Sequence, residues 1–184
     1  MIGLRLLALV LLLQAFALSK TIKAQAQAVD IGSISELKGN AQVYRDKAYG
    51  AELAFPIQQL DNVKTEAGRV AIRFEDDTVV RVMDHSKLVI NSYIYDANPK
   101  KSEMALRFAS GTARFVTGKF NNKKKIKIST PSADVFVLGT DFTITTTPET
   151  GASLVILLPD QYGNASGEIA VETAAGQVIL NQPY

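Results

Sequence analysis

Hydrophobic and polar residues alternate with a period of two along most of the chain from residue 31 onward. Short runs of this kind, closed by Gly, Asn, Asp or Pro, are typical of β-strands that bury one face. Residues 69–74 and 78–82 are two clear runs separated by Glu75-Asp76-Asp77, so they predict a β-hairpin. Further runs follow at intervals typical of sandwiches and barrels, at residues 87–91, 104–108, 113–117 and 125–129.

The last third of the chain is more apolar and predicts strands at residues 134–138, 141–146, 153–158, 168–173 and 177–180. Residues 153–158 are apolar on both faces, which predicts a central strand. The nearest approach to a helical pattern is residues 55–63, where Pro56 would begin one helical turn. We therefore expect an all-β domain of many short, mostly antiparallel strands, either sandwich-like or a short β-solenoid.

The first 28 residues have a different pattern. Arg5 precedes an apolar run over residues 6–18, which covers roughly 20 Å as a helix and is shorter than the hydrocarbon core of about 30 Å. Two small-x-small sites follow, and we expect cleavage after Ala28 or, as an alternative, after Ala26. The predicted organisation is a signal peptide, 1–28, and one β domain, 29–184, with no membrane span left after cleavage. An uncleaved anchor or a buried helix is the other interpretation of this segment.

Charge and cysteine content exclude several classes of protein. The chain has 20 Lys and Arg against 18 Asp and Glu, but Arg5, Lys20 and Lys23 lie in the predicted signal, so the exported part carries 17 against 18. A nearly neutral domain has no field that would attract nucleic acid. The absence of cysteine excludes disulfides and thiolate metal sites. We expect an exported bacterial protein, periplasmic, secreted or at the cell surface, of a size for one domain; nothing indicates its oligomeric state.

Three polar segments could suggest chemistry, and each has a simpler interpretation. His85 lies between Asp84 and Ser86, but sequence neighbours point to opposite sides and cannot act as a triad. The trio at residues 75–77 falls where the hairpin needs turn formers. Residues 160–168 place oxygen side chains at every second position but do not fit a calcium loop. We therefore expect no catalytic residue, no metal site and no cofactor, and a protein that is not an enzyme.

Two surfaces are candidates for binding. The dense basic run Lys123, Lys124, Lys125 and Lys127 suits a polyanion such as an acidic glycan, although a solvated face or protection of an edge strand also explains it. Tyr93 and Tyr95 would share a face and could stack on sugar rings or pack in the core.

Residues 128–144, ISTPSADVFVLGTDFTI, resemble the hallmark of the FecR domain. In that family an extended Thr-Pro-x-Ala segment, here from Thr130 and Pro131, precedes Arg-Gly-Thr-x-Phe-x-Val. Residues 71–88 resemble the family's strand-turn-strand, and residues 111–115 resemble its G-x-hydrophobic-R strand. Leu138 replaces the usual Arg of the motif, and Asp77 stands where Gly is common.

The second half of this motif has a physical interpretation as a structural corner. Gly139 permits a positive φ or a close backbone approach, and the hydroxyl of Thr140 can bond back to the chain. After Asp141, the side chains of Phe142 and Ile144 would return to the core. A Gly-Thr bend in a strand is commonly a bulge, which favours this role over a ligand site.

The resemblance implies a FecR-like β domain in the cell envelope. Members best understood as signalling proteins relay the state of an outer-membrane iron-siderophore receptor to a sigma factor, using a cytoplasmic segment, a transmembrane helix and a further periplasmic domain that we do not expect in this sequence. Our first hypothesis is an exported, non-catalytic module that binds an envelope component, a glycan or a protein partner. The alternative is a sensory or regulatory component of FecR-type transmembrane signalling to a sigma factor through a separate membrane partner.

Overall fold

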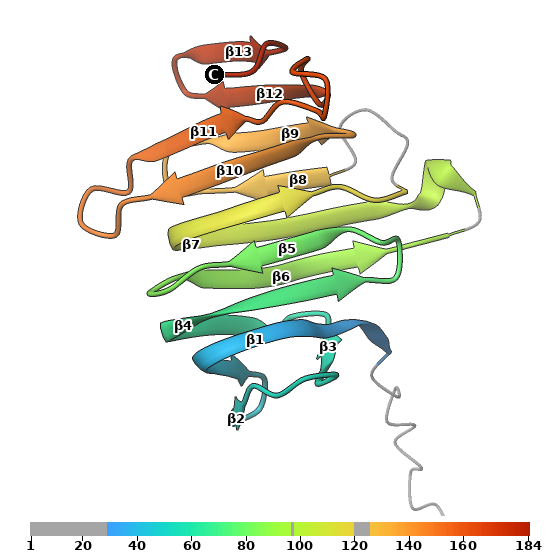
Figure 1. The fold of residues 1–184 in the computed structure, drawn as a ribbon, viewed down its shortest axis with the longest axis vertical. Helices are drawn as coiled ribbons and strands as arrows, with labels where there is room; N and C mark the ends of the chain where they lie inside the picture. Colours follow the sequence, from blue (N-terminus) through green and yellow to red (C-terminus); the bar gives the residue numbers. More distant parts are fainter. Residues whose placement is uncertain (1–28, 97, 120–125) are drawn as a thin grey trace, which may run out of the picture.

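The computed structural model describes residues 29–96, 98–119 and 126–184 of the chain, and these form thirteen β-strands (Figure 1). The strands are β1 (Asp30–Tyr44), β2 (Ala48–Gly50), β3 (Pro56–Gln58), β4 (Asn62–Phe74), β5 (Val79–Val82), β6 (Lys87–Ile94), β7 (Glu103–Val116), β8 (Ile126–Ser129), β9 (Asp134–Leu138), β10 (Asp141–Thr146), β11 (Ser153–Leu157), β12 (Glu168–Thr173) and β13 (Gly176–Leu180). One 3-10 turn, η1 (Pro99–Lys101), is the single helical element in these ranges. Within them only the β7–β8 pairing is parallel, so the prediction of an all-β, mostly antiparallel domain is confirmed.

The strands form two packed layers, and the long strands β1, β4 and β7 contribute to both. In the first layer the order is β3, β1, β4, β5, β7, β10, β11. In the second layer it is β2, β1, β4, β6, β7, β8, β9, β12, β13. Figure 1 shows the strands stacked along the long axis, with β2 near one end and β13 at the other. Of the two expected architectures, the structure is therefore sandwich-like.

Glycines mark the points where a long strand passes from one layer to the other. In β1 the crossing is at Gly39, which has a φ of +72° and lies opposite Gly68 of β4. In β7 it is at Gly111, with a φ of +91°, where an added Cβ would lie 2.1 Å from the Oγ of Ser86. The separate strands predicted at residues 104–108 and 113–117 are thus two halves of one bent strand.

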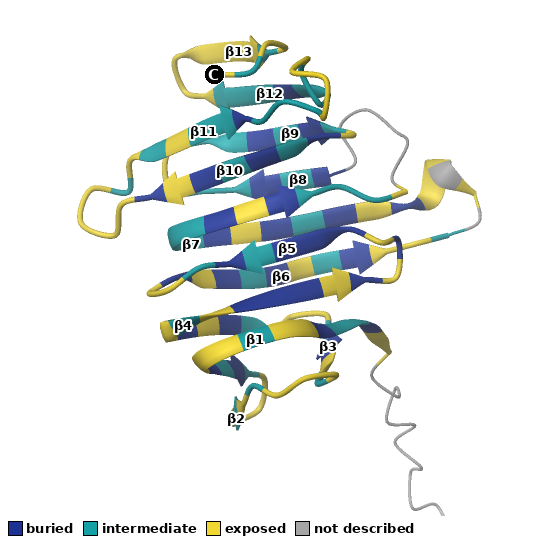
Figure 2. Ribbon diagram, viewed as in Figure 1, coloured by how far each residue is buried: buried dark blue, intermediate teal, exposed yellow. Residues whose placement is uncertain are grey.

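The core lies between the layers and is built from the inward positions of the alternating pattern. Figure 2 shows buried positions concentrated in the middle strands. Phe115 stacks on Phe142 with ring centroids 5.1 Å apart and meets the edge of Phe108 at 6.3 Å. A fully buried phenylalanine contributes about 1.5–3 kcal/mol, so this cluster is a major part of the packing free energy.

Two sequence-based predictions about local structure are wrong. Residues 55–63 form β3, a turn and the start of β4 instead of a helical turn, because the Asp61 carboxylate accepts the Gln58 backbone N–H at 2.8 Å and closes a tight turn. The strand Ser153–Leu157 lies at an edge and not at the centre, since β11 pairs with β10 alone and Leu154 is 59% exposed. Its two apolar faces meet the core and an open end of the sandwich.

The predicted signal peptide, residues 1–28, and the basic residues Lys123, Lys124 and Lys125 lie outside the described residues. In the part that the structure describes, no helix is both long and apolar enough to span a membrane.

Candidate functional site

The first half of the sequence motif forms the turn between β8 and β9. Thr130 donates its backbone N–H to the carbonyl of Ala133 at 2.8 Å, and its Oγ1 accepts the Ala133 N–H at 3.0 Å. Pro131 is exposed and lies against Gly151 of the β10–β11 connection. These residues close the β8–β9 hairpin, and the hydroxyl of Thr130 is used within the turn.

The second half of the motif is the corner at which the chain leaves the second layer and enters the first. Gly139 has a φ of +55°, and it joins β9 of one layer to β10 of the other. Phe142 and Ile144 are fully buried after the corner. The structure therefore places the bend at the glycine that the sequence indicated.

The role of Thr140 differs from the expectation. Its side chain does not bond back to the chain, because the buried Oγ1 has no hydrogen-bond partner among the described residues. The backbone is held by Thr117 instead: the Thr140 N–H donates to Thr117 Oγ1 at 2.7 Å, and the Thr140 carbonyl accepts the Thr117 N–H at 3.0 Å.

The structure brings the motif segments together on adjacent strands. Asp141 of β10 pairs with Arg114 of β7 through a hydrogen bond of 2.8 Å from Nε, and this contact raises the pKa of Arg114. Arg114 in turn lies directly opposite Arg81 of β5, whose charge is matched by Glu36 at 3.0 Å. These residues cover the outer face of the first layer with balanced charge.

Lys127 is the one described member of the candidate polyanion run. Its Nζ lies 2.8 Å from Asp134 Oδ2 and 5.6 Å from the centre of the Phe136 ring. The Lys127 ammonium lowers the pKa of Asp134 through this hydrogen bond. This lysine is therefore already neutralised by its neighbour on β9.

The acidic trio of residues 75–77 forms the β4–β5 turn, as expected. Asp76 is fully buried and accepts a hydrogen bond from the Tyr93 hydroxyl at 3.1 Å and another from Thr78. Burial raises the pKa of Asp76, and it also raises the pKa of Tyr93. Asp77 points outward to Lys119 at 2.6 Å, which lowers the pKa of Asp77.

The other polar segments are also occupied by local bonds. His85 lies in the β5–β6 turn with a φ of +49°. Next to it, the Ser86 hydroxyl donates to backbone oxygens, at 2.9 Å to Asp84. The Asp160 carboxylate accepts the backbone N–H groups of Tyr162 and Asn164 at 2.8 and 2.9 Å. No group of three or more His, Asp or Glu side chains suited to a metal occurs among the described residues.

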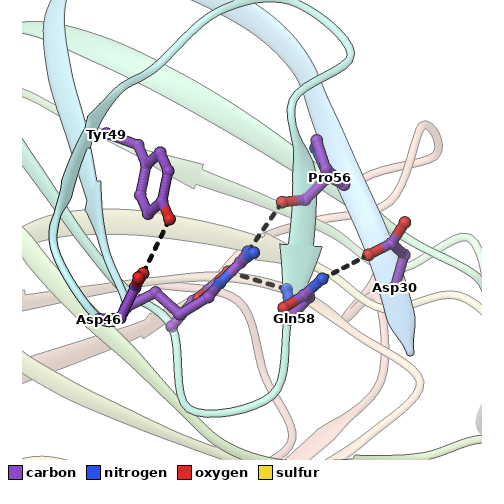
Figure 3. Close-up of polar contacts among 7 residues, drawn as sticks. Asp30, Asp46, Tyr49, Pro56 and Gln58 are labelled. Carbon is purple, nitrogen blue, oxygen red and sulfur yellow. Dashed lines mark hydrogen bonds and ion pairs between the residues drawn. The ribbon is translucent and has the colours of Figure 1, made fainter. Parts of the chain in front are cut away.

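A half-buried ion pair at the β2–β3 end was not found from the sequence. Arg45 donates from Nε and Nη2 to the two oxygens of the fully buried Asp61, each at 2.7 Å. Figure 3 shows the surrounding bonds, in which Gln58 reaches Asp30 at 2.8 Å. Sixteen residues separate the charged pair, and no motif links them, so only the folded structure reveals that they meet.

The opposite end of the sandwich is open. The last strands of the two layers, β11 and β13, each pair with one neighbour only. Apolar side chains are uncovered there: Leu154 is 59%, Val178 61% and Ile179 44% exposed. We call this region the open end, defined by β11, β13 and these three residues.

Comparisons with known proteins identify a protein family that matches this chain. The model of the family described as FecR protein matches residues 61–178. No curated protein matches the chain. Two crystal structures of a candidate anti-sigma factor from Parabacteroides distasonis match it, each with 17% identity and a TM-score of 0.49, over 66% of this chain and 51% of theirs. The chain thus spans about half the length of that protein.

Proposed function

We propose, from the premise that this chain belongs to the FecR protein family, that it is an exported, non-catalytic component of FecR-type signalling that acts by binding a partner protein. The family match supports the regulatory role, and the signal-like N-terminal sequence supports export. The observation that carries the binding role is the unprotected edge of β13 at the open end.

The edge strands at the two ends of the sandwich differ in how well they are protected from pairing with another chain. At the far end β2 and β3 have three residues each, and β3 begins with Pro56, which has no N–H to offer. Short strands and proline are common means of keeping an edge from pairing with another chain. β13 has five residues without a charge or a proline. An edge of this kind is a template for an added strand.

The register of β13 identifies the backbone groups that a partner would meet. A two-residue turn joins β12 and β13, and Thr173 is paired with Gly176. Hydrogen-bonded and non-bonded pairs alternate in an antiparallel ladder, so Val178 bonds to β12. Gln177 and Ile179 direct their N–H and C=O groups to the free side. An extended segment of the partner would pair there and cover the exposed Ile179 side chain.

The polar side chains that could suggest catalysis are engaged in structural hydrogen bonds, which supports a non-catalytic protein. The Ser86 hydroxyl donates to the carbonyls of Asp84 and Thr112 and accepts the Thr112 N–H, so its bonds link a turn to β7. Asp76 and Asp160 hold turns in the same way. A nucleophile needs a base within hydrogen-bond reach, and the partners of the Ser86 hydroxyl are backbone groups only.

The test compares two substitutions at one edge position. Ile179→Pro removes the outward N–H and keeps the β12 ladder, whereas Ile179→Ala keeps that N–H and serves as the matched control. The wild-type protein, cross-linked in the envelope, should trap one partner protein, and Ile179→Pro should reduce that yield at least about tenfold, as expected for a lost backbone contact and its clash.

The same strains give a functional readout. Cells with Ile179→Pro should show the transcript profile of a gene deletion under iron limitation and envelope stress, and cells with Ile179→Ala should resemble the wild type. Wild-type trapping and transcripts in the proline variant would rule out strand addition at β13. An unchanged profile in the deletion strain would remove the signalling role itself.

A further inference from the structure

Three outward-facing cations of the second layer lack the carboxylate partners that two arginines of the first layer have. On the first layer Arg81 and Arg114 each contact a carboxylate, at 3.0 Å for the Glu36 pair. On the second layer Lys64, Lys87 and Arg107 are exposed, and none of them has an ion pair with the described residues. The outer faces of β4, β6 and β7 therefore carry three cations without an ion pair, whereas Lys127 of the neighbouring β8 is paired with Asp134.

Strand register places these three cations next to one another. Lys64 of β4 is directly opposite Lys87 of β6, which puts their Cβ atoms about 5 Å apart. Arg107 of β7 lies opposite Val89, two residues along β6 from Lys87 and on the same face. Diagonal neighbours of this kind are about 7–8 Å apart. We call Lys64, Lys87 and Arg107 the basic band, a diagonal line across three adjacent strands.

The basic band is unfavourable for the sheet on its own. Like charges directly opposite on neighbouring strands repel and destabilise the pairing. Lys64 and Lys87 also line an open hollow of about 490 Å³, together with His85 and Ser110 and with Glu66 as its acidic member. A hollow of that volume is in the range of small-ligand sites. An anion bound from outside would relieve the repulsion that the fold leaves in place.

The surroundings of the band indicate what kind of anion fits. No large exposed hydrophobic residue lies between the three cations; the one on these strands, Ile94, is the last residue of β6. Protein interfaces rely on apolar anchors at their centre, so a protein partner fits poorly here. The neighbours are polar instead: Tyr44 pairs with Asn62, and the Asn62 Oδ1 is buried without a partner in the described structure.

We propose that the basic band is a binding site for an anionic polysaccharide. Three cations in a line match a chain that carries a carboxylate, sulfate or phosphate at each repeat, and the amide and hydroxyl groups beside them suit sugar hydroxyls. The site is on the outer face of β4, β6 and β7. It is independent of strand addition, because β8, β9 and β12 separate it from β13.

The experiment uses dextran sulfate as the probe, with neutral dextran, polyglutamate and anionic phospholipid vesicles as comparisons. The full chain should bind dextran sulfate and not neutral dextran. The variant Lys64→Glu/Lys87→Glu/Arg107→Glu should bind it at least about tenfold more weakly, since each lost charge-assisted contact is worth a factor of that order. The matched control is Lys38→Glu/Lys47→Glu/Lys101→Glu, which changes the net charge equally at exposed positions away from the band.

The outcomes separate the site from general charge attraction. Loss of binding in the band variant with retention in the control supports the proposal. Equal loss in both variants would mean that net charge alone attracts the polymer, and would overturn it. Binding of polyglutamate or vesicles as tight as that of dextran sulfate would assign the band to another class of partner and also overturn it. Circular dichroism of both variants establishes that they remain folded β proteins.

Discussion

Two threonines at the corner between the layers should respond to the same substitution with opposite signs. Thr140 is 4% exposed, and its Oγ1 has no hydrogen-bond partner in the described structure. Thr117 Oγ1 accepts the Thr140 N–H at 2.7 Å. Valine has the shape of threonine without the hydroxyl, so Thr→Val tests the hydroxyl at each position with little change in volume.

The magnitudes follow from what each hydroxyl does. A buried polar group without a partner costs about 1–3 kcal/mol, so Thr140→Val should raise the free energy of unfolding by about 1 kcal/mol or more. Thr117→Val removes an acceptor and leaves the Thr140 N–H unpaired, which should lower the free energy of unfolding by about 1–3 kcal/mol. In a domain of this size about 1 kcal/mol corresponds to a change in Tm of roughly 2–4 °C.

Urea unfolding followed by circular dichroism measures both effects, and an unchanged m-value shows that the unfolded state is comparable. Thr140→Ser, which keeps the hydroxyl, should not share the gain of Thr140→Val. A loss of stability in Thr140→Val as large as that in Thr117→Val would refute the reasoning, because the Thr140 hydroxyl would then have a stabilising partner such as a bound water or ligand.

Three further variants test other parts of the structure. Val178→Pro should lower the free energy of unfolding at least about 1 kcal/mol more than Ile179→Pro in urea, because only the Val178 N–H bonds to β12. Lys64→Glu should raise it by about 0.2–1 kcal/mol by pairing with Lys87, and the gain should vanish in 1 M salt. Burial raises the pKa of Asp76, so the folded state holds its proton more tightly than the unfolded state. The stability that protonated Asp76 contributes to the folded state is fully present below the ordinary pKa of about 3.9 and is lost as the pH rises. Asp76→Asn, which stays neutral, should therefore gain stability relative to wild type between pH 4 and pH 7.

The sequence was most informative where a structure depends on neighbours in the chain. The hairpin of β4 and β5 follows from a period of two on each side of an acidic turn, and the structure pairs Arg73 with Val79 there. Gly139 could be identified as a bend because few other residues accept a φ of +55° easily. These features are set within about ten residues, so a pattern along the chain is enough to predict them.

Features that depend on residues distant in the sequence were either not predicted or predicted wrongly. The helical turn predicted at residues 55–63 does not form, because Asp61 binds Arg45 and the Gln58 backbone in an arrangement that no local pattern encodes. Gly111 marked a break between two predicted strands, but whether the chain turns back or bends into the other layer depends on packing against Ser86. The apolar run of β11 predicted a strand buried on both faces, and it did not show that Leu154 is exposed at the open end.

The basic band illustrates why net charge was a poor guide to binding. Residues 29–184 carry nearly equal numbers of cations and anions, which excludes a strong field over the whole molecule. Interactions at the surface are screened over about 8–10 Å at physiological salt, and packed sheets are themselves about 10 Å apart. The carboxylates that balance Arg81 and Arg114 on the first layer therefore do little to the potential at Lys64 and Lys87. Spacings of about 5–8 Å within the band are shorter than the screening length, so an anion there meets three cations together. Strand register fixes how charge is distributed between the two outer faces, which the net charge does not reveal.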